Sequence, residues 1–373
     1  MIKTDRLLNE FLELVRIDSV SGQERKLCDH LKGRLAMLGL SVREDKAGGS
    51  MPETTGNIIA HLPGSVPGPR LLFCAHMDTV EPGRGIKPVV GGDGVIASEG
   101  ETILGADDKS GIAAIIEALR LVQERKIPHG GITVVFTICE ETGLIGAKGI
   151  EPALSADYGF VLDAAGRPGE IVVRAPSQDK ITATVYGKAA HAGVNPEAGI
   201  NAIYVAAKAI AGMKLGRIDP ETTANIGVIS GGKAVNIVPD SVYLEGEVRS
   251  LKEEKRKDYT ARICRIIEET AKEAGTHADV HTELLYEGFD LSEDQPVVRI
   301  AAEAARLCGL NPSLTQSGGG SDANILNARG IPTVNLATGM ENVHTTRETI
   351  KIADIEKTAQ MVLQIVRSSV GRN

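Results

Sequence analysis

The chain has 373 residues, of which 42% are hydrophobic and 24% are charged, and its formal net charge at pH 7 is −8. This composition is typical of a soluble globular protein of two or three domains. The acidic balance, without a block of Lys or Arg, argues against nucleic acid or an anionic membrane as a partner.

The chain has no apolar run of about 18 residues that would span a membrane, and we expect no signal peptide at its start. The five cysteines, at positions 28, 74, 139, 264 and 308, form no CxxC pair. We therefore expect free thiols and a cytoplasmic location.

In the first half, short apolar runs alternate with helical patterns. Strands are predicted at 57–62, 71–75, 132–139 and 158–162, and apolar residues at helical spacing predict an amphipathic helix at 110–124. Strands separated by helices need crossover connections, so we expect an α/β fold with a mostly parallel sheet and helices on both faces.

The pattern changes in the middle of the chain. Apolar and polar residues alternate at 180–188, as in a half-exposed strand, and further elements are predicted at 201–213 (helix), 224–230 and 241–248 (strands), 252–275 (helix) and 278–285 (strand). Two helices on one face of an antiparallel sheet form an α+β unit. The α/β pattern then resumes, with a helix ending at 307, a strand at 333–336 and a helix at 352–367. We expect one domain formed by 1–176 and 289–373 and an inserted domain at 177–288.

Residues of the types that bind metal ions lie at the ends of the predicted strands or before the first helix. They are His76, Asp78, Asp107, Asp108, Glu140, Glu141, Asp163 and His344. Because ligands bind outside the carboxyl ends of parallel strands, we expect these side chains at one edge of the sheet. Each has an ordinary alternative on its own; acidic residues at a helix start, for example, often only complement the helix dipole.

The adjacent carboxylates of Glu140 and Glu141 repel each other and are costly to desolvate, so they face either water or cations. Because so many residues of metal-binding types are expected at the same edge, cations are favoured over water. Two imidazoles with several carboxylates and no thiolate suit two Zn²⁺ ions that share a carboxylate, with Co²⁺ or Mn²⁺ as substitutes. Two such ions about 3.5–4 Å apart activate a shared water and polarise a carbonyl, which predicts hydrolysis.

Six motifs carry a family resemblance: HMDTV (76–80), LGADDKSG (104–111), EETG (140–143), VLDAAG (161–166), GKAAHAG (187–193) and ENVHTT (341–346). Together they resemble the co-catalytic zinc peptidases of the peptidase T and glutamate carboxypeptidase family, over nearly the full chain. Among its branches, the chain is most similar to the peptidase T-like tripeptide aminopeptidases. The resemblance implies a zinc-exopeptidase catalytic domain with an inserted, ferredoxin-like lid and dimerisation domain.

The resemblance also implies a set of metal ligands. His76 and Asp163 would hold one zinc, Glu141 and His344 would hold the other, and Asp107 would bridge the two. A cis peptide bond between Asp107 and Asp108 is a further family feature.

Two more residues would act in catalysis. Glu140 would be the general base on the metal-bridging water, and Asp78 would orient His76. We expect Glu140 and Glu141 to take different roles because successive side chains at a strand end point in different directions.

In the inserted domain, the resemblance implies that His191 polarises the scissile carbonyl, in many relatives from the other subunit. Asn236 and Arg249 would bind a substrate carboxylate, which the guanidinium fork suits. The ordinary alternatives are a surface histidine and a solvated cation at a strand end. The segment 317–322 resembles a glycine-rich substrate loop. We expect a homodimer through the lid, with a monomer as the alternative.

The predicted function is a zinc-dependent exopeptidase acting on short peptides, of the tripeptide aminopeptidase type. The alternatives are an N-acyl or N-carbamoyl amino-acid amidohydrolase, or a carboxypeptidase, with the same dinuclear site. A non-catalytic relative would lack ligands or the base, yet each of these positions carries the expected residue type.

Overall fold

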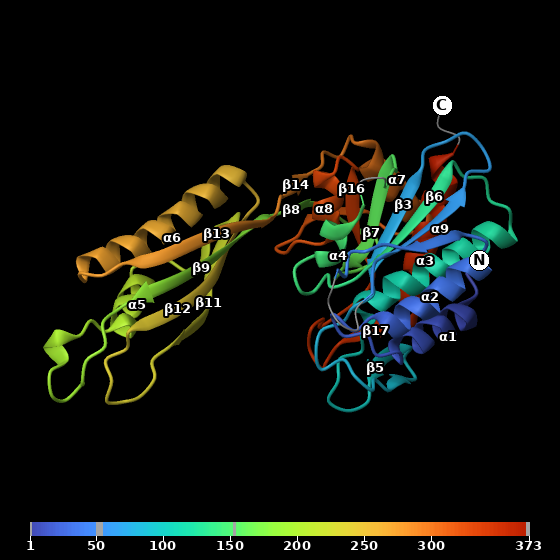
Figure 1. Ribbon diagram of the computed structural model, residues 1–373. Helices are drawn as coiled ribbons and strands as arrows, with labels where there is room; N and C mark the ends of the chain where they lie inside the picture. The colour runs from blue at the N-terminus through green and yellow to red at the C-terminus, as the bar shows by residue number, and fades with distance from the viewer. Residues whose placement is uncertain (1, 50–54, 152–153, 371–373) are drawn as a thin grey trace. The chain divides into compact units, whose positions relative to one another are not determined.

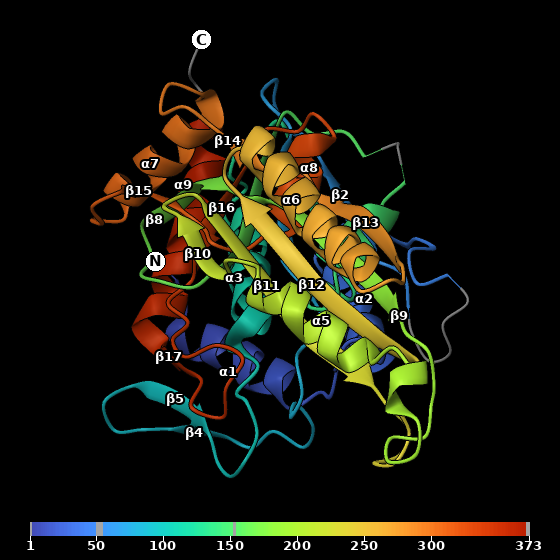
Figure 2. The ribbon, with the colours of Figure 1, turned by 90° about the vertical axis from the view of Figure 1, so that its left-hand side faces the viewer.

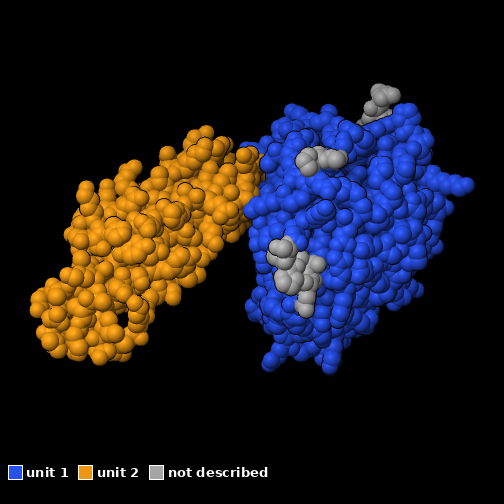
Figure 3. All heavy atoms as spheres, viewed as in Figure 1, with its two compact units in different colours: residues 1–173, 290–317, 321–373 blue, residues 174–289, 318–320 orange. Residues whose placement is uncertain are grey.

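The computed structural model describes residues 2–49, 55–151 and 154–370. It divides into two compact units (Figure 3). The first contains residues 1–173, 290–317 and 321–373, and the second contains 174–289 and 318–320. Glycines 318–320 thus cluster with the second unit rather than with the chain on either side of them.

The larger sheet lies mainly in the first unit. Among the described residues it has nine strands, in the order β1 (Ser41–Glu44), β2 (Ile58–Pro63), β6 (Gly131–Thr137), β3 (Leu71–His76), β7 (Tyr158–Ala164), β16 (Thr333–Ala337), β8 (Glu170–Ala175) and β14 (Phe289–Asp290), with β15 (Ser313–Gln316) paired to β8. The central strands β6, β3, β7 and β16 are parallel, whereas β1, β2 and β8 pair antiparallel. The predicted mostly parallel sheet is therefore confirmed in its centre, with antiparallel strands added towards its edges.

Helices cover both faces of this sheet (Figure 1). They are α1 (Thr4–Val15), α2 (Arg25–Met37), α3 (Ala106–Glu124), α4 (Ile145–Gly149), α7 (Pro296–Leu307), α8 (Asp322–Ala328) and α9 (Ile352–Ser369). Helix α3 packs on β3 and β7 and contacts α1 and α9, while α8 packs on β7 and β16. Every residue of β3 is buried, as expected for a strand covered on both sides, and Phe73 stacks on Phe160.

A small sheet of β4 (Pro88–Val90), β5 (Val95–Ser98) and β17 (Thr349–Lys351) also belongs to the first unit. Ile350 pairs with Ile96, and both side chains are buried. The pairing places the chain that follows position 344 beside the chain that leads into α3. The sequence pattern does not predict this sheet.

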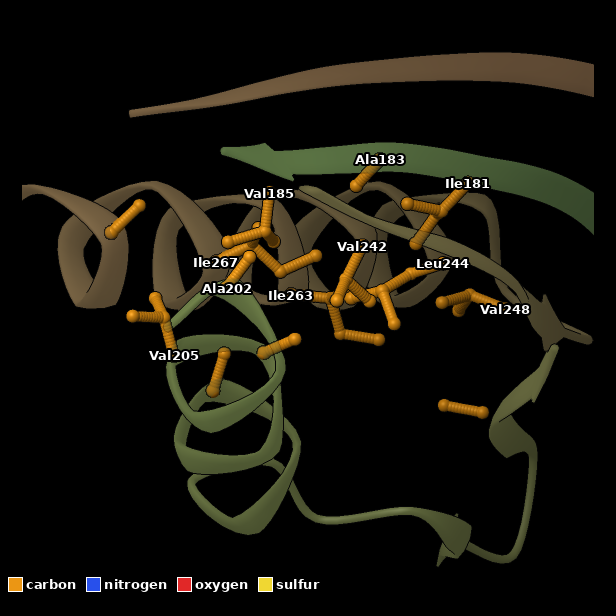
Figure 4. Close-up of a cluster of buried hydrophobic side chains, with 14 of the residues drawn as sticks. Ile181, Ala183, Val185, Ala202, Val205, Val242, Leu244, Val248, Ile263 and Ile267 are labelled. Carbon is orange, nitrogen blue, oxygen red and sulfur yellow. The ribbon is translucent and has the colours of Figure 1, made fainter. Parts of the chain in front are cut away.

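The second unit has the predicted α+β architecture (Figure 2). Its antiparallel sheet has the order β10 (Gly216–Asp219), β11 (Thr222–Gly231), β12 (Ser241–Ser250), β9 (Ser177–Tyr186) and β13 (Ala278–Tyr286), accompanied by α5 (Ala202–Ala211), α6 (Glu253–Glu273) and a short 3₁₀ helix at Pro196–Ala198. Alternate residues of β9, among them Ile181 and Val185, face α5 and α6 in one apolar core (Figure 4).

The five cysteines are free, as predicted. No helix in the described ranges is long and apolar enough to cross a membrane.

Candidate metal and catalytic site

The parallel strands bring the predicted ligands to one edge of the first unit. His76 is the last residue of β3, and β6 and β7 flank that strand on either side. Asp163 lies near the end of β7, and Glu140 and Glu141 follow the end of β6. Because His76 pairs with Thr137 and Cys74 pairs with Val161, the strands β3, β6 and β7 end close together along the sheet.

Two histidines lie on either side of one carboxylate. His76 Nε2 is 2.9 Å from Asp107 Oδ1 and 3.5 Å from Asp163 Oδ1. His344 Nε2 is 3.3 Å from Asp107 Oδ2 and 2.9 Å from Glu141 Oε1. Each oxygen of Asp107 thus faces one imidazole, which is the arrangement that a bridging carboxylate needs.

The carboxylates of this site carry more negative charge than the two histidines beside them can compensate. Burial raises the pKa of Asp163 to about 7, although His76 acts in the opposite direction. Burial and the charge of Asp163 raise the pKa of Glu140 well above its ordinary value. The pKa of His344 is raised to about 10 by its hydrogen bonds to Asp107 and Glu141. In the absence of metal the site therefore favours bound protons.

This donor set fits a pair of divalent cations. One group of ligand atoms, from His76, Asp107 and Glu141, lies within 4.8 Å of one another, and so does a second group from His76, Glu140 and Asp163. Imidazoles and carboxylates without a thiolate suit zinc, cobalt or manganese. Positive charge between these groups would replace the protons that the cluster favours.

The turn after β6 separates the two adjacent glutamates. The strand ends at Thr137, so Glu140 and Glu141 do not lie at a strand end, and the expected alternation of side chains is not the reason for their separation. Instead Cys139 has a φ of 49°, and its N–H donates to Glu24 Oε1 at 3.1 Å. A left-handed residue turns the chain sharply at this point.

The carboxylate of Asp78 holds this turn. It accepts hydrogen bonds from the N–H of Glu140 (2.9 Å), the N–H of Glu141 (3.2 Å) and the hydroxyl of Ser21 (2.6 Å). Its distance to His76 Nδ1 is 3.5 Å, whereas the backbone oxygen of Asp78 lies 2.9 Å from that nitrogen. The expected orientation of His76 thus comes mainly from the Asp78 carbonyl, and the carboxylate positions Glu140 and Glu141. The implied cis bond between Asp107 and Asp108 is present.

Sequence patterns missed several buried polar residues beside these ligands. Asn335 Oδ1 accepts the N–H of Asp163 at 3.0 Å, and Glu348 accepts backbone N–H groups in the loop before Asp107. Asp322, within the predicted glycine-rich segment, is buried and accepts the Thr137 hydroxyl at 2.5 Å. The one sequence signal that could have revealed such a residue is a polar side chain inside an apolar run. Asn335 in β16 is an example, because a buried amide requires a hydrogen-bond partner.

The predicted lid residues all belong to the second unit. His191 and Asn236 are exposed and lie on neighbouring loops, where the N–H of Ala192 donates to Asn236 O at 3.0 Å. Arg249, on β12, is half-buried and paired with Glu247 through two contacts of 3.0 Å. Side chains suited to a substrate carboxylate are therefore present, although the positive charge of Arg249 is already paired with Glu247 of the same unit.

Comparisons with known proteins bear on the family of this chain. Residues 178–275 match the peptidase dimerisation domain, and residues 57–207 match peptidase family M28. The crystal structure of aminopeptidase PepT from Bacillus cereus is 48% identical and has a TM-score of 0.91, covering 99% of this chain and 100% of that one. A tripeptidase from Staphylococcus aureus is 46% identical with a TM-score of 0.95, covering 99% of each chain.

More distant sequences match over the same length. Peptidase T of Escherichia coli (strain K12) is 29% identical over 414 residues, which cover 99% of this chain and 100% of the relative. High identity over almost the whole of both PepT-like structures includes both units described above. The chain therefore belongs to the peptidase T family of metallopeptidases.

Proposed function

We propose that this protein is an aminopeptidase that removes the N-terminal residue of short peptides, tripeptides above all, with a dinuclear zinc centre. The observation that carries the proposal is the convergence of two histidines with the carboxylates of Asp107, Glu141 and Asp163. Glu140 lies beside them. The names of the relatives with 46% and 48% identity, a tripeptidase and an aminopeptidase, support the substrate class.

In this proposal, His76 and Asp163 would hold one ion, Glu141 and His344 would hold the other, and Asp107 would serve both. The ions supply positive charge that polarises the scissile carbonyl and makes water more acidic. Co²⁺ or Mn²⁺ would serve as substitutes, because the ligand set is the same for these ions.

Glu140 is the proposed general base. It takes a proton from the attacking water and transfers it to the amine that leaves when the peptide bond breaks. The hydrogen bond from its N–H to Asp78 Oδ1 supports this role, because it fixes the backbone that carries the carboxylate. Glu141 has a different partner, His344 at 2.9 Å. The two adjacent glutamates thus divide into a ligand and a base.

The second unit supplies the proposed substrate contacts. His191 polarises the carbonyl, while Asn236 and Arg249 bind the carboxylate of the peptide. Its match to a peptidase dimerisation domain supports a homodimer formed through this unit.

The test is the isosteric variant Glu140→Gln, which keeps the size of the side chain and removes its basic group. We expect tripeptide turnover to fall by about 10²–10⁴-fold, the usual contribution of a general base. Metal content, measured by elemental analysis, should stay at the wild-type level. Glu151→Gln, a change at an exposed glutamate paired with Arg43, is the matched control. Wild-type turnover in Glu140→Gln would contradict the assignment.

The choice of substrate end is tested on the wild-type enzyme. A tripeptide, its N-acetylated form and its C-terminal amide are compared by product analysis. Release of the first residue only when the amino terminus is free supports an aminopeptidase. Preference for the acetylated peptide would instead indicate an amidohydrolase, and release of the last residue a carboxypeptidase.

A further inference from the structure

The loop that carries His344 is closed by backbone pairing. Glu341 and Thr349 exchange hydrogen bonds, with N–O distances of 2.9 and 3.0 Å. Inside the loop, the Thr345 hydroxyl donates to Asn342 O at 2.8 Å, and His344 has a φ of 60°. The strand β17 follows at once and pairs with β5. The position of His344 is therefore linked to the segment that precedes α3.

Glu348 makes a second link between these segments. The whole residue is only 2% exposed. One oxygen, Oε2, accepts the N–H groups of Leu104 at 2.8 Å and Gly105 at 2.7 Å, and Oε1 accepts the N–H of Asp107 at 2.9 Å. The residue at the N-cap of α3, Gly105, has no side chain to offer. Glu348 thus binds the N–H of Asp107, at the second position of the helix, which the side chain of an N-cap residue ordinarily satisfies.

These contacts connect two candidate metal ligands. His344 lies four positions before Glu348, and Asp107 is a residue whose N–H Glu348 accepts. The two ligands meet where His344 Nε2 lies 3.3 Å from Asp107 Oδ2. We propose that Glu348 is a positioning residue of the metal centre, whose carboxylate holds the Asp107 backbone at the distance from His344 that both ligands need. The inference rests on the proposed dinuclear centre.

A carboxylate suits this role better than its amide. Both oxygens of Glu348 accept hydrogen bonds, whereas glutamine offers one acceptor and one NH₂ donor. In Glu348→Gln, the NH₂ group of the glutamine therefore faces at least one of the three buried N–H groups, and two donors cannot form a hydrogen bond. The loop must move to relieve this contact, and Asp107 moves with it.

The test is a titration of the chelator-treated protein with Co²⁺ alone, following the visible absorption spectrum. We expect Glu348→Gln to bind Co²⁺ about 10–100-fold more weakly than wild type, the usual effect of losing a partner that orients a ligand. We also expect its spectrum to change, because the absorption of bound Co²⁺ reports the ligand geometry.

Glu117→Gln is the matched control. Glu117 is also buried and lies on α3, the helix whose first turn Glu348 contacts, but it pairs with Arg6 at 2.7 Å. This variant should melt at a lower temperature and still bind Co²⁺ with the wild-type affinity and spectrum. A general loss of stability is thereby separated from a displaced ligand.

The outcomes are distinguishable. A folded Glu348→Gln protein with wild-type affinity and spectrum overturns the positioning role and leaves the proposed function intact. Should this variant fail to fold, Glu348→Asp replaces it; weaker Co²⁺ binding then supports the role, and unchanged binding overturns it. A wild-type protein that binds no Co²⁺ would contradict both this role and the proposed centre.

Discussion

At the scale of single residues, the carboxylates of the site are held close together at a cost. Asp163 and Glu140 have raised pKa values because burial and neighbouring carboxylates disfavour their charged forms. Asp322 behaves similarly, since burial raises its pKa to about 6. The repulsion between these carboxylates lowers the stability of the metal-free protein. A bound cation relieves it.

This repulsion predicts the pH dependence of the metal-free protein. Between pH 5 and pH 7 the unfolded chain has lost the Asp163 proton, whereas the folded protein, with a pKa of about 7, still holds it. The native state therefore binds more protons, and the free energy of unfolding falls as the pH rises through this range. We expect the chelator-treated protein to melt a few degrees higher at pH 5 than at pH 7.

Two comparisons test whether the proton on Asp163 causes this pH dependence. Asp163→Asn has no carboxyl proton to lose, so the difference between the two pH values should become smaller. Added Zn²⁺ should reverse the trend, because its ligands must be deprotonated to bind. A metal-free wild-type protein that is more stable at pH 7 than at pH 5 would refute the explanation.

At the scale of elements, one buried ion pair anchors α6 to β9 in the second unit. Arg256 and Asp179 are 4% and 5% exposed and form a close salt bridge, and the Thr260 hydroxyl donates to Asp179 Oδ2 at 2.8 Å. Arg256 and Thr260 lie on α6, the long charged helix whose apolar side fills the core, and Asp179 lies on β9. Removing one partner leaves a charge buried without compensation.

We expect Arg256→Ala to lower the free energy of unfolding by about 3–5 kcal/mol, measured by urea denaturation with circular dichroism. Replacing both partners, as in Asp179→Leu with Arg256→Met, should recover most of the loss because no charge is left behind. Co²⁺ affinity should be unchanged in each variant, since every proposed ligand lies in the first unit. Equal instability of the single and double variants would show that packing, rather than the uncompensated charge, explains the loss.

Strong local periodicity explains which elements are predictable. The fully apolar run of β3 and the alternating run of β9 specify their strands, and the ends of β3, β6 and β7 specify where His76 and Asp163 lie. The β17 strand has three residues and forms only against β5, so no local pattern marks it. Glu348 is missed for the same reason, because its partner Asp107 is 241 positions away.

At the scale of the whole molecule, the second unit has an apolar surface that solvent does not favour. On β11, Val228 is 45% and Ile229 is 53% exposed, and Tyr204 on α5 is 70% exposed. The outer side of β11 pairs with β10 only up to Ala224, so within the described residues the rest of this edge has no strand beside it. Open apolar edges are suited to pairing with a second chain.

We therefore expect the wild type to be a dimer by light scattering and the double variant Val228→Lys, Ile229→Lys to be a monomer. Lysines on an edge strand disfavour pairing through their charge. Leu314→Lys, a change at a 40% exposed leucine of the first unit, is the control and should remain dimeric. A wild-type monomer, or a dimer that persists in the double variant, would rule out this interface.

Dimerisation becomes part of catalysis if His191 acts in the partner's site. Glu140→Gln and His191→Ala are then each inactive alone, because every site lacks one group. In a mixed dimer, the subunit with intact Glu140 receives His191 from its partner, so one complete site forms. Mixing and refolding the two variants should restore part of the tripeptidase activity. With His191 acting in its own subunit, no mixed dimer contains a complete site, and the mixture stays inactive.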